Sequence, residues 1–342
     1  MKLIKTIDAA GQVLCHDITR IVRGETKGPA FRKGHIITEA DIPALLDMGK
    51  EHVYIWELAP GQLHENDAAE ILCGICRGAH ISRSEVKEGK IDLTAETDGL
   101  FTLDKDKLNR INSLGQIAIA ARHDNFPVKA GDALAGMRVV PLVIRGERLN
   151  AAREIGGGVP LMGVLPYKVK KAGVVTTGSE VLNGRIADAF TPVIEEKLAE
   201  YGTGVLMRSL PGDDPARITA ACMEMIGAGM DIVICTGGMS VDPDDRTPLA
   251  IKNTGARVVS YGAPVLPGSM FMLAYYAAPQ GDVPILGLPG CVMYSKRTIF
   301  DLVLPRILAG VKISAENISG MGAGGLCLNC GECAFPNCGF GK

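Results

Sequence analysis

The sequence predicts an α/β protein in which a three-layer domain with a mainly parallel sheet follows a β-rich N-terminal region. Three observations lead to this class. From about residue 168, short apolar strands alternate with amphipathic helices, which is typical of a parallel sheet covered on both faces. Residues 1–165 instead carry mostly short strands between turn residues. A chain of 342 residues also exceeds one ordinary core, so we expect more than one domain.

The N-terminal region, residues 1–165, is expected to contain two small subdomains that divide near residues 60–80. Turn residues and apolar periodicity place its elements. The predicted elements are a helix over 39–48, a strand over 52–57, a helix over 66–78, and mostly strands with small helices from about 80 to 148.

The second domain, residues 168–310, has the clearest alternation of strands and helices. Strands are predicted within 167–178, 203–210, 230–238, 256–262 and 283–290, and helices within 186–202 and 213–229, from about Thr247, and within 292–308. For the helix within 213–229, Asp214 is the expected N-cap, and Pro215 suits the first turn because its fixed φ matches the helix.

Charge and hydropathy exclude several function classes. The formal net charge of −2 gives no electrostatic footprint for nucleic acid or an anionic membrane. No apolar run approaches the roughly 18 residues of a membrane span. The start, "MKLIKTIDAAG", lacks the features of a signal peptide. We therefore expect a cytoplasmic protein.

Three glycine-containing loops follow predicted strands, and two of them carry acidic residues. They are "TTGSEVLNGRIAD", "CTGGMSVDPDDRT" and "GLPG". Ligands of an open α/β sheet bind beyond the carboxyl ends of its strands, and glycines let backbone amides approach an anion closely. Acids beside such an anion site usually hold Mg²⁺ or position a water for attack on phosphorus. For Asp188, Asp213 and Asp214, the alternative is a role as helix caps or solvated groups.

These loops also carry a family resemblance. The segments "TTGSEVLNGRIAD", "PGDDPARI", "TGGMSVDPDDRTPLA" and "LPG" resemble the molybdopterin-binding domain of molybdenum-cofactor biosynthesis proteins, in particular the bacterial molybdenum insertases and the E domain of gephyrin. The resemblance covers roughly residues 170–310 well and 1–165 loosely. It implies that the chain binds molybdopterin or its adenylylated form with Mg²⁺, takes part in cofactor biosynthesis, and forms a homo-oligomer, with a dimer favoured.

The resemblance further implies which residues form the site. Catalytic roles in handling Mg²⁺ and the adenylyl group are expected of Glu180, Asp244 and Asp245. The residues expected to bind the cofactor are Thr177, Gly178, Ser179, Gly184, Asp188, Asp213, Gly237, Gly238, Ser240, Pro289 and Gly290.

Departures from the family pattern keep other functions open. Insertases carry oxyanion-holding lysines in a Pro-Gly motif where this chain has Leu266 and Ser269, and Cys291 replaces the asparagine of their "LPGNP" segment. The stretch "GGMSVDPDDRTPLA" also resembles the same-fold domain of the competence-damage-inducible family, whose members cleave pyrophosphate bonds. A nucleotide pyrophosphohydrolase and a non-catalytic carrier or sensor of the cofactor are therefore the alternatives.

Residues 311–342 are predicted to be a glycine-rich linker, to about residue 325, followed by a cysteine-rich metal-binding tail. Four of the ten cysteines lie there, namely Cys327, Cys330, Cys333 and Cys338. Their spacing, C-x2-C-x2-C-x4-C, is close to the iron–sulfur run of bacterial ferredoxins, which has x3 before its last cysteine. Four thiolates can also bind zinc. An iron–sulfur cluster, zinc and a disordered reduced tail are the three alternatives.

Overall fold

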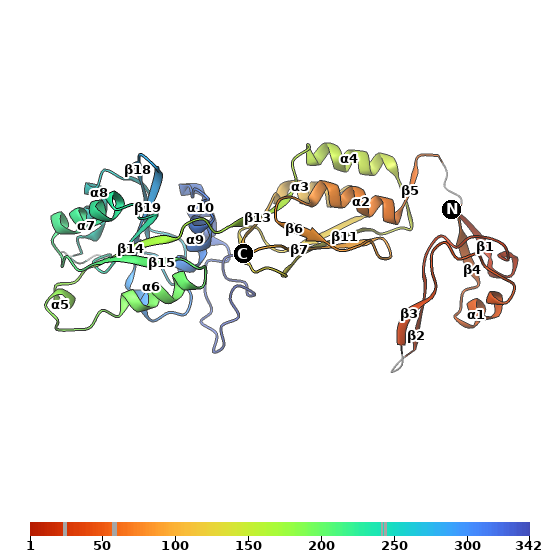
Figure 1. Cartoon of the computed structure of the whole chain (residues 1–342), viewed down its shortest axis with the longest axis horizontal. Helices are drawn as coiled ribbons and strands as arrows, with labels where there is room; N and C mark the ends of the chain where they lie inside the picture. Colours follow the sequence, from red (N-terminus) through yellow and green to blue (C-terminus); the bar gives the residue numbers. More distant parts are fainter. Residues whose placement is uncertain (23–25, 57–59, 241, 243–244) are drawn as a thin grey trace. The chain divides into compact units, whose positions relative to one another are not determined.

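The chain divides into two compact units (Figure 1). Its computed structural model describes residues 1–22, 26–56, 60–240, 242 and 245–342. Unit 1 comprises Met1–Glu96, Phe101–Asp124 and Ala130–Val164, and unit 2 comprises Thr97–Leu100, Asn125–Lys129 and Leu165–Lys342. Within the described residues, no helix has both the length and the apolar character that a membrane span needs.

Unit 1 begins with a small strand-rich part. Strand β1 (Lys2–Lys5) pairs antiparallel with β4 (His52–Ile55), and β2 (Ile18–Val22) pairs antiparallel with β3 (Thr26–Phe31). Helix α1 (Asp41–Asp47) lies within the span predicted to be helical. The buried apolar side chains of this part are Ala9, Leu14, Ile18, Ile37, Leu45 and Val53.

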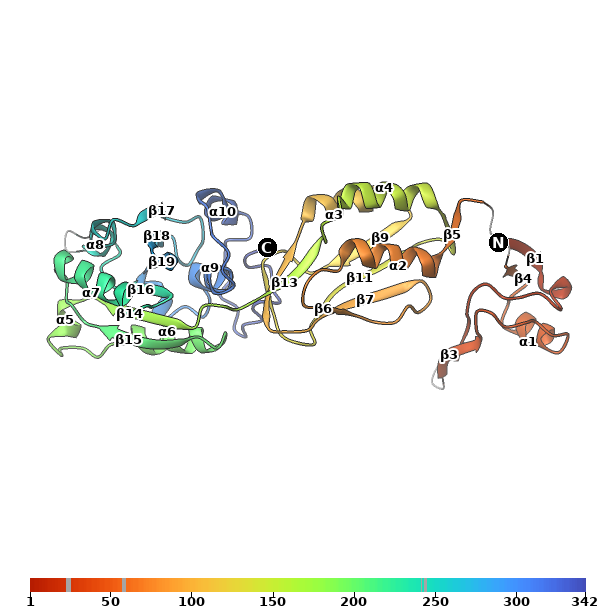
Figure 2. The same cartoon turned by 45° about the horizontal axis from the view of Figure 1, so that its top comes forward.

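The next part of the chain combines strands with three helices. Its elements are β5 (Gln62–His64), α2 (Glu65–Cys76), β6 (Ile81–Arg83), β7 (Lys90–Ala95), β8 (Gly99–Leu103), α3 (Lys105–Asn112), β9 (Ile117–Ala121), β10 (Phe126–Val128), β11 (Ala133–Val139), β12 (Val143–Arg145), α4 (Gly146–Gly156) and β13 (Met162–Pro166). Strands β6, β7, β11 and β9 form an antiparallel sheet in that order, and α2, α3 and α4 lie on one side of it (Figure 2). Helix α4 lies beyond the predicted elements; its buried residues, Leu149, Ala152 and Gly156, give only a weak apolar stripe.

Unit 2 is built on one mixed sheet. Its strands are β14 (Lys171–Thr176), β15 (Gly204–Ser209), β16 (Ile232–Thr236), β17 (Arg257–Tyr261), β18 (Met272–Ala278) and β19 (Gly281–Leu288). Its helices are α5 (Ser179–Leu182), α6 (Phe190–Ala199), α7 (Pro215–Gly227), α8 (Thr247–Asn253), α9 (Ile299–Leu308) and α10 (Ala315–Ser319). The strand order is β15-β14-β16-β19-β18-β17, with parallel pairing from β15 to β19 and antiparallel pairing of β18 with β19 and β17.

Alternate side chains of this sheet enter two different cores. On β16, Ile232 and Ile234 pack with α6 and α9, whereas Val233 and Cys235 pack with α7 and α8. Because successive side chains of a strand point to opposite faces, helices cover both faces of the sheet. The predicted three-layer α/β class is therefore confirmed. The predicted start of α7 is also observed, since the Asp214 side chain accepts from the Ala216 N–H at 2.9 Å.

The strand order places a crevice between β14 and β16. From β14 the chain moves to β15 on one side, and after α7 it returns to β16 on the other side. Loops that leave the carboxyl ends of β14 and β16 therefore diverge, and such a switch point is where open α/β sheets bind ligands. The two strands end at Thr176 and Thr236, which are in register.

Residues 311–342 pack onto unit 2. The segment expected to be a linker contains α10, which begins with a capping box between Ser314 and Asn317. Ile318, Met321 and Phe340 are buried in the same core as α6 and α9. These three apolar residues lie too far apart in the sequence to form a periodic pattern. The glycine-rich composition therefore predicted a linker.

A buried carboxylate joins α9 to α6. Asp301 is 2% exposed and accepts hydrogen bonds from Lys197 Nζ at 2.6 Å and from Arg297 at 2.8 Å. Its other oxygen accepts from the Thr298 N–H at 2.7 Å, which completes the capping box at the start of α9. Arg297 reaches the more exposed Glu200 at 3.1 Å. Three positive or polar donors thus converge on one buried acid.

Removal of this acid should destabilise unit 2 strongly. We expect Asp301→Ala to lower the free energy of unfolding by about 3–5 kcal/mol, because Lys197 would stay buried without a counter-charge. The matched control, Glu200→Ala, removes an exposed partner of the same arginine and should cost at most about 1 kcal/mol. Urea unfolding followed by circular dichroism measures both. Equal losses in the two variants would contradict this account.

Candidate functional site

Threonine hydroxyls hold the loops together at the crevice between β14 and β16. Thr177 Oγ1 donates to the carbonyl oxygen of Thr236 at 3.0 Å, which ties the loop after β14 to the end of β16. Thr247 Oγ1 donates to the carbonyl of Gly237 at 2.8 Å, and its N–H donates to the carbonyl of Gly238 at 3.2 Å. Gly237 and Gly238 are therefore tied to Thr247 at the start of α8.

Gly237 and Gly238 are required by this packing. Their φ angles are +80° and +55°, which L side chains rarely adopt. A Cβ at Gly237 would lie 2.6 Å from Thr177 Oγ1, and one at Gly238 would lie 2.8 Å from Thr247 Oγ1. The absence of side chains at Gly237 and Gly238 thus makes room for the neighbouring threonines. The two glycines can still line a ligand site with their backbone atoms.

A cavity of about 470 Å³ opens beside this loop. Six of the residues predicted to form the site line it, namely Gly237, Gly238, Ser240, Asp245, Pro289 and Gly290. The other lining residues were not predicted to bind the cofactor, although Ser269 and Cys291 stand out as departures from the family pattern. They are Met239, Pro267, Gly268, Ser269, Met270, Cys291 and Tyr294. The Pro-Gly motif at 267–268 was the signal that could have indicated the second wall.

Asp245 is the carboxylate that lines this cavity among the described residues. Its N–H donates to the Asp242 carbonyl at 2.9 Å, and its Oδ2 accepts from the Asp242 N–H at 3.1 Å. The Tyr261 hydroxyl donates to the Met239 carbonyl. Burial and the nearby negative charge of Asp245 both raise the pKa of this hydroxyl. One oxygen of Asp245 is therefore used by the loop, and the other can reach a ligand.

The lining contains hydroxyl groups but no basic side chain. Ser240, Ser269 and Tyr294 supply hydroxyls, and no lysine, arginine or histidine lies among the described lining residues. Burial raises the pKa of the Cys291 thiol, so this group is neutral at physiological pH. An anion in this cavity would be held by backbone N–H groups, hydroxyls and any cation that it brings.

Three other predicted acids lie in different surroundings. Asp213 Oδ2 accepts from both the N–H and the hydroxyl of Ser179 at 2.7 Å, which joins the loops after β14 and β15. Asp188 accepts from the N–H groups of Phe190 and Thr191 at the start of α6, as in the capping alternative. Glu180 is exposed on α5.

Three of the remaining predicted residues lie in or next to α5. The Glu180 carboxylate lies over Gly178, since a Cβ there would be 2.8 Å from Glu180 Oε1. Gly184 is exposed in the turn after α5 with φ +66°. Asp244, predicted to be catalytic, lies outside the described residues. The structure thus brings the second and third glycine loops to one cavity, and Thr177 of the first loop hydrogen-bonds to Thr236 beside the second.

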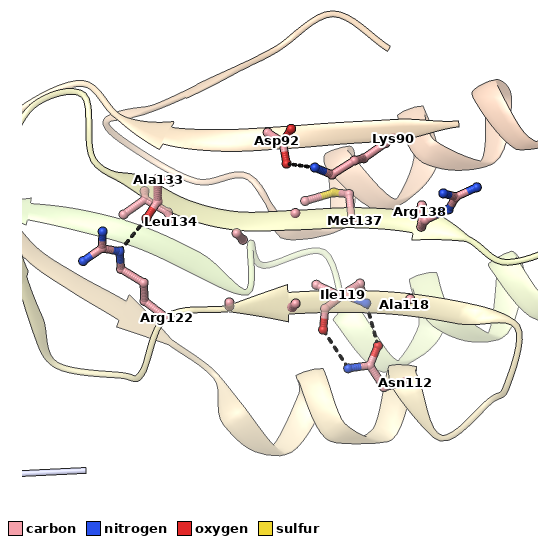
Figure 3. A pocket seen from close by; sticks show the side chains of 14 residues that line it. Lys90, Asp92, Asn112, Ala118, Ile119, Arg122, Ala133, Leu134, Met137 and Arg138 are labelled. Atoms are coloured by element: carbon pink, nitrogen blue, oxygen red, sulfur yellow. Dashed lines mark hydrogen bonds and ion pairs between the residues drawn. The ribbon is translucent and has the colours of Figure 1, made fainter. Parts of the chain in front are cut away.

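A broader hollow in unit 1, of about 820 Å³, is a weaker candidate (Figure 3). It lies over β7, β11 and β9. Lys90 and Asp92 pair with each other at 2.9 Å, Asn112 bonds to the backbone of β9, and Arg122 donates to a carbonyl of β11. These polar groups stabilise the sheet, so we place the candidate site in unit 2.

Most of the α/β unit matches a family model for molybdopterin-binding domains. Residues 173–309 match the family described as "probable molybdopterin binding domain". This match confirms the resemblance seen in the sequence. Residues 3–57 match a family described as a domain of unknown function, DUF8806.

Individual relatives agree with this assignment. The chain is 25% identical over 178 residues to a molybdopterin molybdenumtransferase of Synechococcus elongatus, covering 49% of this chain and 44% of that protein. It is 40% identical over 77 residues to a CinA-like protein of Mycolicibacterium vanbaalenii, covering 22% of this chain and 18% of that protein. The chain thus spans less than half the length of these curated relatives.

A solved structure is also similar to this chain. It is the tungsten cofactor synthesizing protein MoaB from Pyrococcus furiosus, which is 21% identical to this chain. The match has a TM-score of 0.34 and covers 41% of this chain and 92% of that one.

Two glycines of the cavity should respond differently to a methyl group. We expect Gly237→Ala to lower the free energy of unfolding by about 1–3 kcal/mol or more, because of its positive φ and the contact with Thr177. Gly290→Ala meets nothing within 4 Å and should change stability by less than about 0.5 kcal/mol. Urea unfolding of both variants tests this contrast. A neutral Gly237→Ala would refute the packing role of that glycine.

Proposed function

We propose that unit 2 binds the phosphate-bearing end of molybdopterin, or of its adenylylated form, in the cavity beside Gly237 and Gly238, with Mg²⁺ held by Asp245. The observation that carries this proposal is a cavity at the carboxyl ends of β16 and β19 that combines a glycine loop, one carboxylate and, among its described lining residues, no basic side chain. This cavity lies within the residues that match the molybdopterin-binding family. The function is a step of molybdenum-cofactor biosynthesis. We expect a cytoplasmic protein that forms a homodimer.

The size and donors of the cavity fit this ligand. Its volume of about 470 Å³ falls in the range of about 300–1,000 Å³ typical of small-molecule sites. The hydroxyls of Ser240 and Ser269 and the backbone of the glycine loop supply neutral donors for phosphate oxygens.

The absence of basic lining residues, within the part that the structure describes, favours a metal-dependent site. A phosphate normally needs positive charge nearby, and Mg²⁺ usually binds through one or two carboxylates together with substrate phosphates. Asp245 can supply the protein carboxylate. Ser269 stands where molybdenum insertases carry a lysine, so binding of a phosphorylated pterin is better supported here than binding of free molybdate.

A second candidate function has an observation of its own. The 40% identity over 77 residues to a CinA-like protein favours nucleotide pyrophosphate chemistry at the same cavity. A non-catalytic carrier of the cofactor would use the same contacts without turnover. The ligand therefore separates these functions better than the fold does.

Ligand class can be tested by thermal-shift titration with molybdopterin and with a dinucleotide pyrophosphate, each with and without Mg²⁺. We expect stabilisation by molybdopterin that requires Mg²⁺, because a ligand that binds only the folded state raises its stability. Stabilisation by the dinucleotide alone, followed by its hydrolysis, would favour the second candidate. A response to neither ligand would refute the cavity assignment.

The role of Asp245 can be tested separately. We expect Asp245→Asn to weaken Mg²⁺-dependent pterin binding by about 100-fold, the upper scale for losing a group that positions a metal. Stability should change little, because the asparagine oxygen can still accept from the Asp242 N–H. Asp242→Asn is the matched control, since the exposed Asp242 contributes only backbone groups to that loop in the contacts observed. Equal binding by both variants and the parent would show that Asp245 only shapes the loop.

A further inference from the structure

The cysteine-rich segment is a folded loop. Its ends meet where the Gly341 N–H donates to the carbonyl of Gly324 at 2.9 Å, and Phe340 is 5% exposed in the core of unit 2. A single parallel bridge joins Leu326 to Leu266. In this bridge the Cys327 N–H donates to the Leu266 carbonyl at 2.8 Å. A disordered tail would make none of these contacts.

All four cysteines of this loop line one cavity of about 250 Å³. The other lining residues are Lys296, Arg297, Leu326, Leu328, Asn329, Ala334, Phe335, Gly339 and Phe340. Cys327 and Cys338 are half-buried, and Cys330 and Cys333 are exposed. The loop therefore places four thiols around a space that is largely apolar and bounded by two cations.

A zinc site and an iron–sulfur cluster need different arrangements of their four thiolates. Zinc draws its four ligands to about 2.3 Å from one ion. Within the described residues, no three histidine, cysteine or acidic side chains are grouped closely enough to hold a metal ion. A cubane cluster is larger and binds each thiolate on a different iron, so it suits four thiols arranged around a cavity.

We propose that residues 326–340 bind a [4Fe–4S] cluster through Cys327, Cys330, Cys333 and Cys338. The three cysteines at x2 spacing follow the ferredoxin pattern, and Cys338 supplies the fourth ligand from the same loop. Gly339 lines the cavity without a side chain, which allows backbone N–H groups to approach sulfur.

Charge around the cavity supports a cluster ligated by four thiolates. Such a centre carries net negative charge, and hydrogen bonds, charge and burial around it set its reduction potential. Lys296 Nζ donates to the Gly331 carbonyl at 2.6 Å, and the Arg297 guanidinium lies 4.9 Å from the centre of the Phe335 ring. Lys296 is thus held at the cavity by the loop itself, whereas Arg297 is held there by its ion pairs with Asp301 and Glu200.

The cluster loop is attached to both segments that form the outer wall of the candidate ligand cavity. Leu266 precedes Pro267 and Gly268, which line that cavity, and Lys296 follows Cys291 and Tyr294. The loop therefore places a one-electron centre beside the proposed pterin site. The cluster proposal itself goes beyond pterin binding and does not depend on it.

The experiment is anaerobic reconstitution of the full chain with ferrous iron and sulfide, compared with zinc alone. We expect about four irons and four acid-labile sulfides per chain, with broad visible absorption that dithionite bleaches. Cys330→Ser and Cys333→Ser should each lose most of this iron. Cys291→Ser, which removes a half-buried thiol outside the cluster cavity, should retain it.

Folding and ligand binding are measured on the same samples. Circular dichroism of the apo variants should match the parent, because the two substituted cysteines are exposed. One zinc per chain that depends on these cysteines, with no iron retained, would overturn the cluster proposal, as would no bound metal. Failure of molybdopterin to bind would refute the proposed function and leave the iron result unaffected.

Discussion

The buried carboxylate of Asp301 is the interaction on which the arrangement of unit 2 depends most. A buried ion pair gives little net stability, but any shift that separates its partners leaves a charge buried alone. Asp301 therefore fixes Lys197 on α6 and Arg297 ahead of α9 in one arrangement. Lys197 also donates to the Lys296 carbonyl at 3.1 Å, so the chain is held at the point where the candidate cavity and the cysteine loop meet.

The residues at the site fall into two groups with different tasks. Gly290 and Asp245 line the cavity. Thr177, Asp213 and Asp188 instead form hydrogen bonds within and between the loops. An acid in a glycine-rich loop can thus serve the loop rather than the ligand. This distinction depends on hydrogen-bond partners, which a linear motif does not specify.

Much of unit 2 could be predicted from the sequence because its signals are local. The Asp214 cap, the start of α8 at Thr247 and the existence of strands β14 and β16 all follow from neighbouring residues. Strand β18 could not be identified, because its apolar run has no alternation and its place is set by antiparallel pairing with β19. The segment 267–270, which leads into that strand, was recognised only as a departure from a family motif and was not placed at the cavity.

The fold of the cysteine loop also could not be predicted from local sequence signals. The spacing of its cysteines was visible, but the three alternatives for the tail could not be separated by spacing alone. The added information is tertiary, namely the burial of Phe340 and the bridge between Leu266 and Leu326. Neither follows from composition, because a glycine-rich stretch with few apolar residues has the signature of a linker.

The close packing of Gly237 and Gly238 against Thr177 and Thr247 affects how tightly this site can bind a ligand. A flexible loop that must order around its ligand loses about 1–2 kcal/mol of backbone entropy for each residue that becomes fixed. Here the threonine contacts have already fixed the backbone of Gly237 and Gly238 during folding. A ligand that arrives at the crevice meets preorganised amides, so more of its interaction energy is retained as binding free energy.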